Sequence, residues 1–177
     1  HNKNIWTKGW YIMGLLQVAT NTVSSAVASV TLTGIDSDDV YMLAINNFVP
    51  STDAQDIKIR VVESGTPNST SNYDYTHVLL RSDTTFNDTS ATNQTFFDGS
   101  TSTGNATGEG ANGIFYIYNA NNSSEFTFFT QEVVLASHTS LLAGFQGGCT
   151  FTSASQVEGV QIFAGADNIQ SGTFTLY

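Results

Sequence analysis

The segment Tyr73-Asp74-Tyr75-Thr76-His77 places two phenol rings and an imidazole on alternate positions. Alternate residues of a β-strand share one face, so Tyr73, Tyr75 and His77 would lie side by side. An aromatic face of this kind could stack on sugar rings, as in a protein that recognises a glycan. Stripes of this type more often pack into a core or a subunit interface. The pattern therefore favours packing over ligand binding.

Three carboxylates, Asp36, Asp38 and Asp39, are gathered within four residues. Carboxylate oxygens are the ligands of Ca²⁺, which takes six to eight of them. A full calcium loop also needs a Gly at its bend and a distal bidentate Glu, and neither stands at the required spacing. The other interpretation is a turn in which Asp side chains accept hydrogen bonds from nearby backbone N–H groups. We predict the turn and leave cation binding by these residues open.

The residues suited to nucleophilic catalysis do not form a recognisable set. His77 and His138 have Ser or Asp neighbours, but a catalytic triad is recognised by geometry and not by spacing. Cys149 is the single cysteine, so an intrachain disulfide or a cysteine-rich zinc site is excluded. We predict that Cys149 is a small buried apolar residue. No two carboxylates stand in a context that suggests a glycosidase pair. We expect neither enzymatic activity nor a cofactor.

Composition limits the partners of the chain. It has 177 residues, of which 15 are acidic and 5 basic, and its formal net charge is −10. Binding of nucleic acids relies on clustered Lys and Arg, and the scattered bases of this chain exclude it. Anionic membrane surfaces are disfavoured for the same reason. No apolar run approaches the roughly 20 residues that span a bilayer, so we expect no membrane insertion.

Segments rich in β-branched and aromatic residues recur along the chain between turn-forming residues. Apolar and polar residues alternate in them with period two, and the helical spacing i, i+3, i+4, i+7 is missing. The predicted strands are 11–19, 26–33, 40–46, 57–62, 75–81, 113–118, 125–135, 140–145, 156–163 and 172–177. The fold predicted for residues 1–177 is a single all-β domain, an antiparallel β-sandwich of jelly-roll type.

The alternation also predicts which side chains face the interior of the sandwich. These are Val30, Leu32, Ile45, Ile59, Val61, Leu79, Ile114, Ile117, Leu141, Val160, Ile162 and Phe174.

Two segments fall outside the strand pattern. Residues 83–112 consist almost wholly of Ser, Thr, Asn, Asp and Gly, which predicts a long polar loop interrupted by a short strand near 95–97. Residues 1–12 carry Trp6, Trp10 and Tyr11 ahead of the sandwich. Aromatic side chains at this density need a partner surface, so we predict an interface segment and a homo-oligomer. The alternative is that this segment is the first strand of the sandwich.

The C-terminal residues 159–177 contain two alternating segments, Val160–Phe163 and Thr173–Tyr177, on either side of a turn-forming stretch. This pattern predicts a closing β-hairpin. With that hairpin, the order of segments along the chain resembles a family of bacteriophage virion structural proteins. The segments that carry the resemblance are 24–35, 40–45, 72–75, 113–119 and 169–177.

The resemblance implies a non-enzymatic structural component of the virion with a jelly-roll β-sandwich. A tail-fibre or tail protein that contributes to host attachment is the favoured function. The implied partners are other virion proteins, further copies of the chain, with a trimer favoured, and a glycan of the host surface. Two alternatives remain: a capsid decoration, or cement, protein that binds the shell lattice, and a secreted carbohydrate-binding module.

Overall fold

Alternation of apolar and polar residues decides the local structure of this chain. The structure is a computed structural model that describes residues 14–83 and 86–177. This part of the chain forms thirteen β-strands, β1 to β13, and no helix. Every strand pairing is antiparallel. The prediction of an all-β, antiparallel β-sandwich is confirmed. Within those residues, no helix has the length and hydropathy that crossing a bilayer requires.

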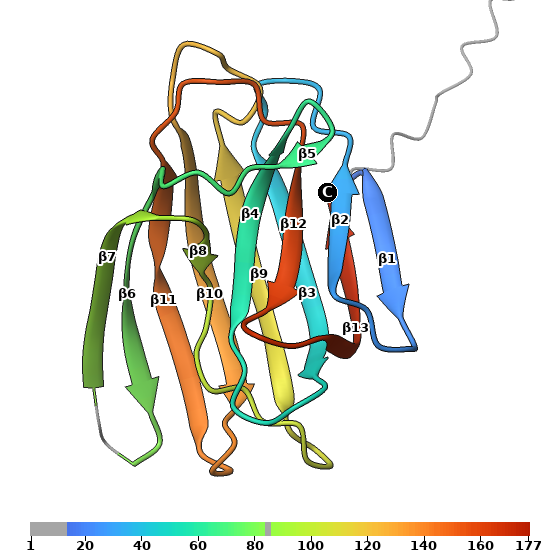
Figure 1. The fold of residues 1–177 in the computed structure, drawn as a ribbon, viewed down its shortest axis with the longest axis vertical. Helices are drawn as coiled ribbons and strands as arrows, with labels where there is room; N and C mark the ends of the chain where they lie inside the picture. Colours follow the sequence, from blue (N-terminus) through green and yellow to red (C-terminus); the bar gives the residue numbers. More distant parts are fainter. Residues whose placement is uncertain (1–13, 84–85) are drawn as a thin grey trace, which may run out of the picture.

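Eight of the strands form one layer, which we call the large sheet (Figure 1). Its strands, in spatial order, are β1 (Ala19–Val23), β13 (Ile169–Leu176), β3 (Tyr41–Pro50), β9 (Gly110–Tyr118), β10 (Thr127–Ala136), β11 (Leu142–Phe151), β6 (Tyr73–Arg81) and β7 (Phe86–Gln94). β1 and β7 are therefore its two edges.

The remaining strands form the second layer, the small sheet, which covers one face of the large sheet (Figure 1). Its strands, in spatial order, are β2 (Ser29–Thr33), β12 (Gly159–Ala164), β4 (Ile57–Glu63) and β5 (Thr66–Pro67), and β8 (Phe97–Asp98) also pairs with β4. The other face of the large sheet has no second layer among the described residues.

The two sheets share one hydrophobic core. Phe97 of β8 is fully buried, and its ring centroid lies 5.8 Å from those of Phe115 and Phe129 on the opposite sheet. A polar contact also joins the layers, because the backbone N–H of Val61 in β4 donates to the Tyr73 hydroxyl in β6 at 3.0 Å. Aromatic packing and this hydrogen bond together hold the layers in one register.

The predicted C-terminal hairpin is wrong. β12 lies in the small sheet between β2 and β4, whereas β13 lies in the large sheet between β1 and β3. The turn-forming residues between them carry the chain from one layer to the other. Each strand thereby gains two hydrogen-bonded neighbours, which a terminal hairpin would not supply.

The predicted long polar loop at 83–112 is also wrong. It contains the nine-residue strand β7, the short strand β8 and the first residues of β9. The short strand expected near 95–97 corresponds to β8. β7 reads as a loop in sequence because it is an edge strand with most of its side chains exposed on both faces, so no apolar face marks it.

The predicted interior residues are mostly buried, with one clear error. Ile114 is 39 % exposed and lies on the outer face of β9, while its neighbours Phe115 and Ile117 fill the core. Leu79 and Leu141 are only partly buried. The strand predicted at 11–19 lies partly outside the described residues, and β1 begins only at Ala19.

Candidate functional site

The aromatic stripe of β6 belongs to the core. Tyr73 and His77 are 1 % and 3 % exposed, and Tyr75, partly buried, stacks on His77 with ring centroids 5.9 Å apart. The ring of Phe145 meets His77 edge-on at 5.4 Å. The three side chains share one face, as predicted, but that face points between the sheets. The packing interpretation is confirmed, and these residues offer no platform for a sugar.

The carboxylates of the acidic turn bind to different donors. Asp36 accepts a hydrogen bond from the Tyr41 hydroxyl at 3.3 Å, and Asp39 accepts one from the Ser37 hydroxyl at 2.7 Å. Asp38 accepts one from the side-chain amide of Asn122 at 3.2 Å. The donors are thus side chains rather than the backbone N–H groups that we expected. Within residues 14–83 and 86–177, no three His, Cys, Asp or Glu side chains are grouped as metal ligands would be.

The remaining candidates for catalysis, Cys149, His77 and His138, differ in their exposure to solvent. Cys149 is 4 % exposed, and desolvation raises the pKa of its thiol, with Asp74 adding to the rise. This confirms a buried apolar role and opposes formation of a reactive thiolate. His138 lies exposed after β10, whereas His77 is enclosed in the core. Trp6, Trp10 and Tyr11 lie outside the described residues, and their interface role stays a prediction.

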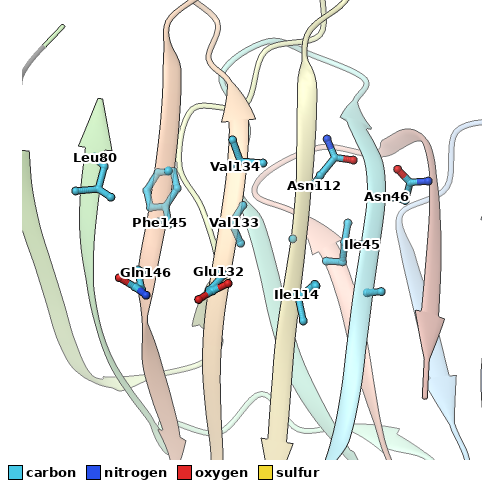
Figure 2. Close-up of a pocket in the computed structure, with 13 residues that line it drawn as sticks. Ile45, Asn46, Leu80, Asn112, Ile114, Glu132, Val133, Val134, Phe145 and Gln146 are labelled. Atoms are coloured by element: carbon cyan, nitrogen blue, oxygen red, sulfur yellow. The ribbon is translucent and has the colours of Figure 1, made fainter. Parts of the chain in front are cut away.

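The outer face of the large sheet contains a broad groove (Figure 2). This main groove has a volume of about 590 Å³ and is lined from five adjacent strands, β3, β9, β10, β11 and β6. The strand register places Ile114, Glu132 and Gln146 in one row across the groove. The next row holds Asn112, Val134, Gly144 and Leu80.

The floor of the main groove depends on residues without side chains. A Cβ atom on Gly113 would lie 2.7 Å from Cγ2 of Val133, so Gly is required there for close packing. A Cβ on Gly144 would meet its nearest neighbours at 3.7 and 3.9 Å, which is ordinary contact. Gly144 is thus open to substitution, and a larger side chain there would fill the groove.

A β-bulge fixes the rim of the groove. β3 changes register between Ile45 and Phe48, and Asn47 adopts φ 56°. The side-chain oxygen of Asn112 accepts a hydrogen bond from the backbone N–H of Asn47 at 2.9 Å. The bulge leaves the backbone N–H of Asn47 without a partner in the β-ladder, and the side chain of Asn112 supplies that partner instead.

Two further hollows continue the main groove on the same face. The second groove has a volume of about 410 Å³, shares Glu132 and Gln146 with the main groove and reaches Tyr116 and Tyr118. The other, of about 320 Å³, shares Leu80, Val134 and Gly144 and extends to Leu142. Together the three hollows extend from Tyr118, at the end of β9, to Leu80 in β6.

The main and second grooves have an apolar lining with one charged residue, Glu132, whereas Arg81 lines the third hollow. Leu80, Tyr116 and Val134 are 41 %, 43 % and 47 % exposed. Glu132 is the only charged residue that lines the main groove, and its side chain makes no hydrogen bond or ion pair to another described residue. A surface of this kind can bind an apolar partner that brings one positive charge or hydrogen-bond donors. It lacks the acid–base pair or nucleophile of an active site.

The sequence contained a signal for this face that alternation alone does not use. Every position is apolar or aromatic in the segment 114–118, and three of the four positions are aromatic in the segment 126–129, where Thr127 is the exception. A strand with two apolar phases has apolar side chains on both faces. One face enters the core, and the other remains exposed in the described structure.

No family model, curated protein or solved structure matches this chain.

Proposed function

We propose that this chain is a non-enzymatic structural component of a virion, of tail-fibre or tail type, which works by contact through the outer face of its large sheet. The observation that carries the proposal is the main groove with its apolar lining. Exposed apolar side chains gathered on one face, as here, are typical of an interaction site. Of the three candidates for catalysis, His77 and Cys149 are enclosed in the core, and His138 lies apart from them on the surface.

The strand order supports a jelly-roll architecture. In an eight-stranded jelly roll, the first, eighth, third and sixth strands form one sheet, and the second, seventh, fourth and fifth form the other. The order β1-β13-β3-β9 in the large sheet and β2-β12-β4-β8 in the small sheet follows this rule when β5, β6, β7, β10 and β11 are treated as insertions. Jelly rolls occur in viral capsid and lectin domains. This part of the argument is an analogy of fold.

The insertions supply the binding surface. β10 and β11, together with β6 and β7, extend the large sheet beyond β9. The main groove lies across the junction, since β3 and β9 line one side and β10, β11 and β6 line the other. The additional strands thus turn the edge of a jelly roll into a broad contact face.

The location of the protein in the virus particle tests this proposal. Antibodies against the chain, imaged on purified particles by electron microscopy, should label the tail. Labelling spread over the head would overturn the tail assignment in favour of capsid decoration. Absence from every particle would overturn both virion assignments.

A secreted carbohydrate-binding module is the second candidate, because the second groove places Tyr116 beside Glu132 and Gln146. A phenol ring next to hydrogen-bonding groups can stack on a sugar and orient it. A glycan array is the direct test. Binding that is lost in Tyr116→Ala but retained in Tyr75→Phe, together with absence from virus particles, would favour this function over the first.

A further inference from the structure

The main and second grooves follow one another along the strands of the large sheet. The main groove includes Asn112 of β9, the second groove includes Tyr116 of the same strand, and both are lined by Glu132. Four residues of a β-strand span about 13 Å. Asn112 in the main groove and Tyr116 in the second groove are therefore about 13 Å apart along β9, and Glu132 lines both grooves.

The N-terminal segment, residues 1–13, has a matching pattern of side chains. Trp6, Lys8 and Trp10 occupy alternate positions. In an extended backbone they share one face, with the two indole rings about 13 Å apart and the ammonium group between them. This spacing is the same as that between Asn112 and Tyr116, one from each groove.

We infer that the N-terminal segment of one copy binds the outer face of an adjacent copy, with Trp6 and Trp10 in the two grooves and Lys8 at Glu132. The inference rests on the proposed function, because a virion component is held next to its own copies. It identifies both the occupant of the grooves and the surface that the aromatic segment requires.

Charge favours this occupant. Lys3 and Lys8 are two of the five bases of the chain, whereas its first acidic residue is Asp36. The segment is therefore positive, and the chain that follows it is strongly negative. An ammonium group beside the unpaired Glu132 would gain a charge-assisted hydrogen bond, and the amide of Gln146 can accept one from an indole N–H.

The described end of the segment points to an adjacent copy rather than to the same chain. Leu15 and Leu16 are 67 % and 83 % exposed, so the chain before β1 does not fold onto the sheet there. Val18 still pairs with β13, because its N–H donates to the carbonyl of Leu176 at 2.8 Å. The main groove lies level with Thr20 and later residues of β1, so residues 14–17 lie beyond it, whereas Tyr116 of the second groove lies level with the chain near Val18.

The surface between β1 and the groove also opposes docking within one chain. Thr20 and Thr175 pair through their hydroxyls at 3.0 Å, and Thr22 and Thr173 do so at 3.2 Å. An aromatic segment folded back across this polar strip would cover hydroxyl groups before it reached apolar surface. Thirteen extended residues span roughly 45 Å, which is enough to reach a neighbour. Such head-to-tail contacts close into a ring when the rotation allows, and a trimer is one such ring.

Crosslinking between two differently tagged full-length chains tests the contact. One chain carries Lys8→Cys and the other Glu132→Cys, and a short thiol-reactive crosslinker is added to the mixture. We expect a covalent dimer that contains both tags. Lys8→Cys mixed with Thr31→Cys, on the outer face of the small sheet, should give none. Cys149 is 4 % exposed and remains unreacted, as the unsubstituted chain will verify.

Charge reversal gives a second measurement on the intact protein. Glu132→Lys should weaken self-association at least tenfold in sedimentation or light scattering, since like charges then meet in a partly desolvated groove. Lys8→Glu combined with Glu132→Lys should restore most of that loss. Gly144→Leu should also weaken association by filling the main groove, whereas Thr31→Leu should not.

Three results would overturn the inference: no crosslink between tagged chains, a link only within a chain that carries both cysteines, or association unchanged by Glu132→Lys and Gly144→Leu. These results are independent of where the protein lies in the particle. Tail labelling without crosslinking would remove this inference alone, and crosslinking without any particle labelling would remove the virion assignment alone.

Discussion

Several polar side chains of the core lack hydrogen-bond partners. Both ring nitrogens of His77, both side-chain polar atoms of Gln131 and one carboxylate oxygen of Asp98 are buried without a protein partner. A buried polar group without a hydrogen-bond partner lowers the stability of the fold. When the group is ionisable, the size of this loss depends on pH. Among these groups, His77 and Asp98 respond to pH in opposite directions.

His77 should make the fold less stable in acid. Burial lowers its pKa below the usual 6.5, so the unfolded chain takes up a proton that the folded chain refuses. The free energy of unfolding therefore falls as the pH drops below about 6.5. His77→Phe should flatten this part of the curve, as followed by urea denaturation between pH 5 and 8. An unchanged slope in the variant would contradict the prediction.

Asp98 should act in the opposite sense. Burial, with repulsion from Asp56, raises its pKa from 3.8 to about 7, although Lys58 partly offsets the rise. The folded chain then holds a proton that the unfolded chain releases, so stability is lost as the pH rises from about 4 to about 7. Asp98→Asn should remove this loss and expose the opposite slope of His77. Chemical denaturation over the same pH range is the measurement, and a steeper loss in the variant would be inconsistent with it.

The hydroxyl of Tyr73 should contribute measurably to stability. It accepts a hydrogen bond from the N–H of Val61 and donates one to the carbonyl of Asn68 at 2.8 Å. Tyr73→Phe leaves both groups without that partner and should cost about 1–3 kcal/mol. The melting temperature should fall by about 2–4 °C per kcal/mol. Tyr116→Phe is the control, because the Tyr116 hydroxyl makes no hydrogen bond to a described residue, and equal losses in the two variants would refute the assignment.

At the scale of the elements, the positions of strands can be predicted from the sequence, whereas the pairing of one strand with another cannot. Ser29–Thr33 alternates throughout and Ile57–Glu63 alternates as far as Val61, and both form strands at the predicted positions. Which strands become neighbours depends on the whole chain, so β12 and β13 looked like a hairpin although they lie in different sheets. β7 has no apolar face, so its sequence predicts a loop although the segment is a strand. The groove draws residues from five strands, so it could not be predicted before their order was known.

β7 should be the least protected of the long strands. It pairs only with β6, and most of its side chains are exposed, whereas β10 is paired on both sides and buries alternate residues. Backbone amides in edge elements open at low cost. Hydrogen exchange followed by mass spectrometry should show faster exchange in 86–94 than in 127–136. Equal protection in the two segments would mean that a partner covers this edge.

At the scale of the whole molecule, the small sheet covers one face of the large sheet and leaves the other open. The covered face is held by aromatic rings that meet between the layers, and the open face carries the grooves. The side chains that stabilise the fold and those proposed to contact a partner thus lie on opposite faces of the same strands. Val133 packs into the core while the adjacent Val134 is 47 % exposed beside the main groove. Substitutions on the open face should therefore change association with little effect on folding.

The shared core predicts that both sheets unfold together and that Phe97 is central to this cooperativity. Phe97 is fully buried and meets Phe115 and Phe129 of the large sheet, so Phe97→Ala should cost about 3–5 kcal/mol. Phe86→Ala is the matched control, because Phe86 is 67 % exposed and its loss should change stability by less than about 0.5 kcal/mol. Denaturation followed by far-ultraviolet circular dichroism and by aromatic fluorescence should give one coincident transition in each protein. Two separate transitions would show that the layers fold independently, and an equal cost in the two variants would show that the contact between the sheets does not hold them together.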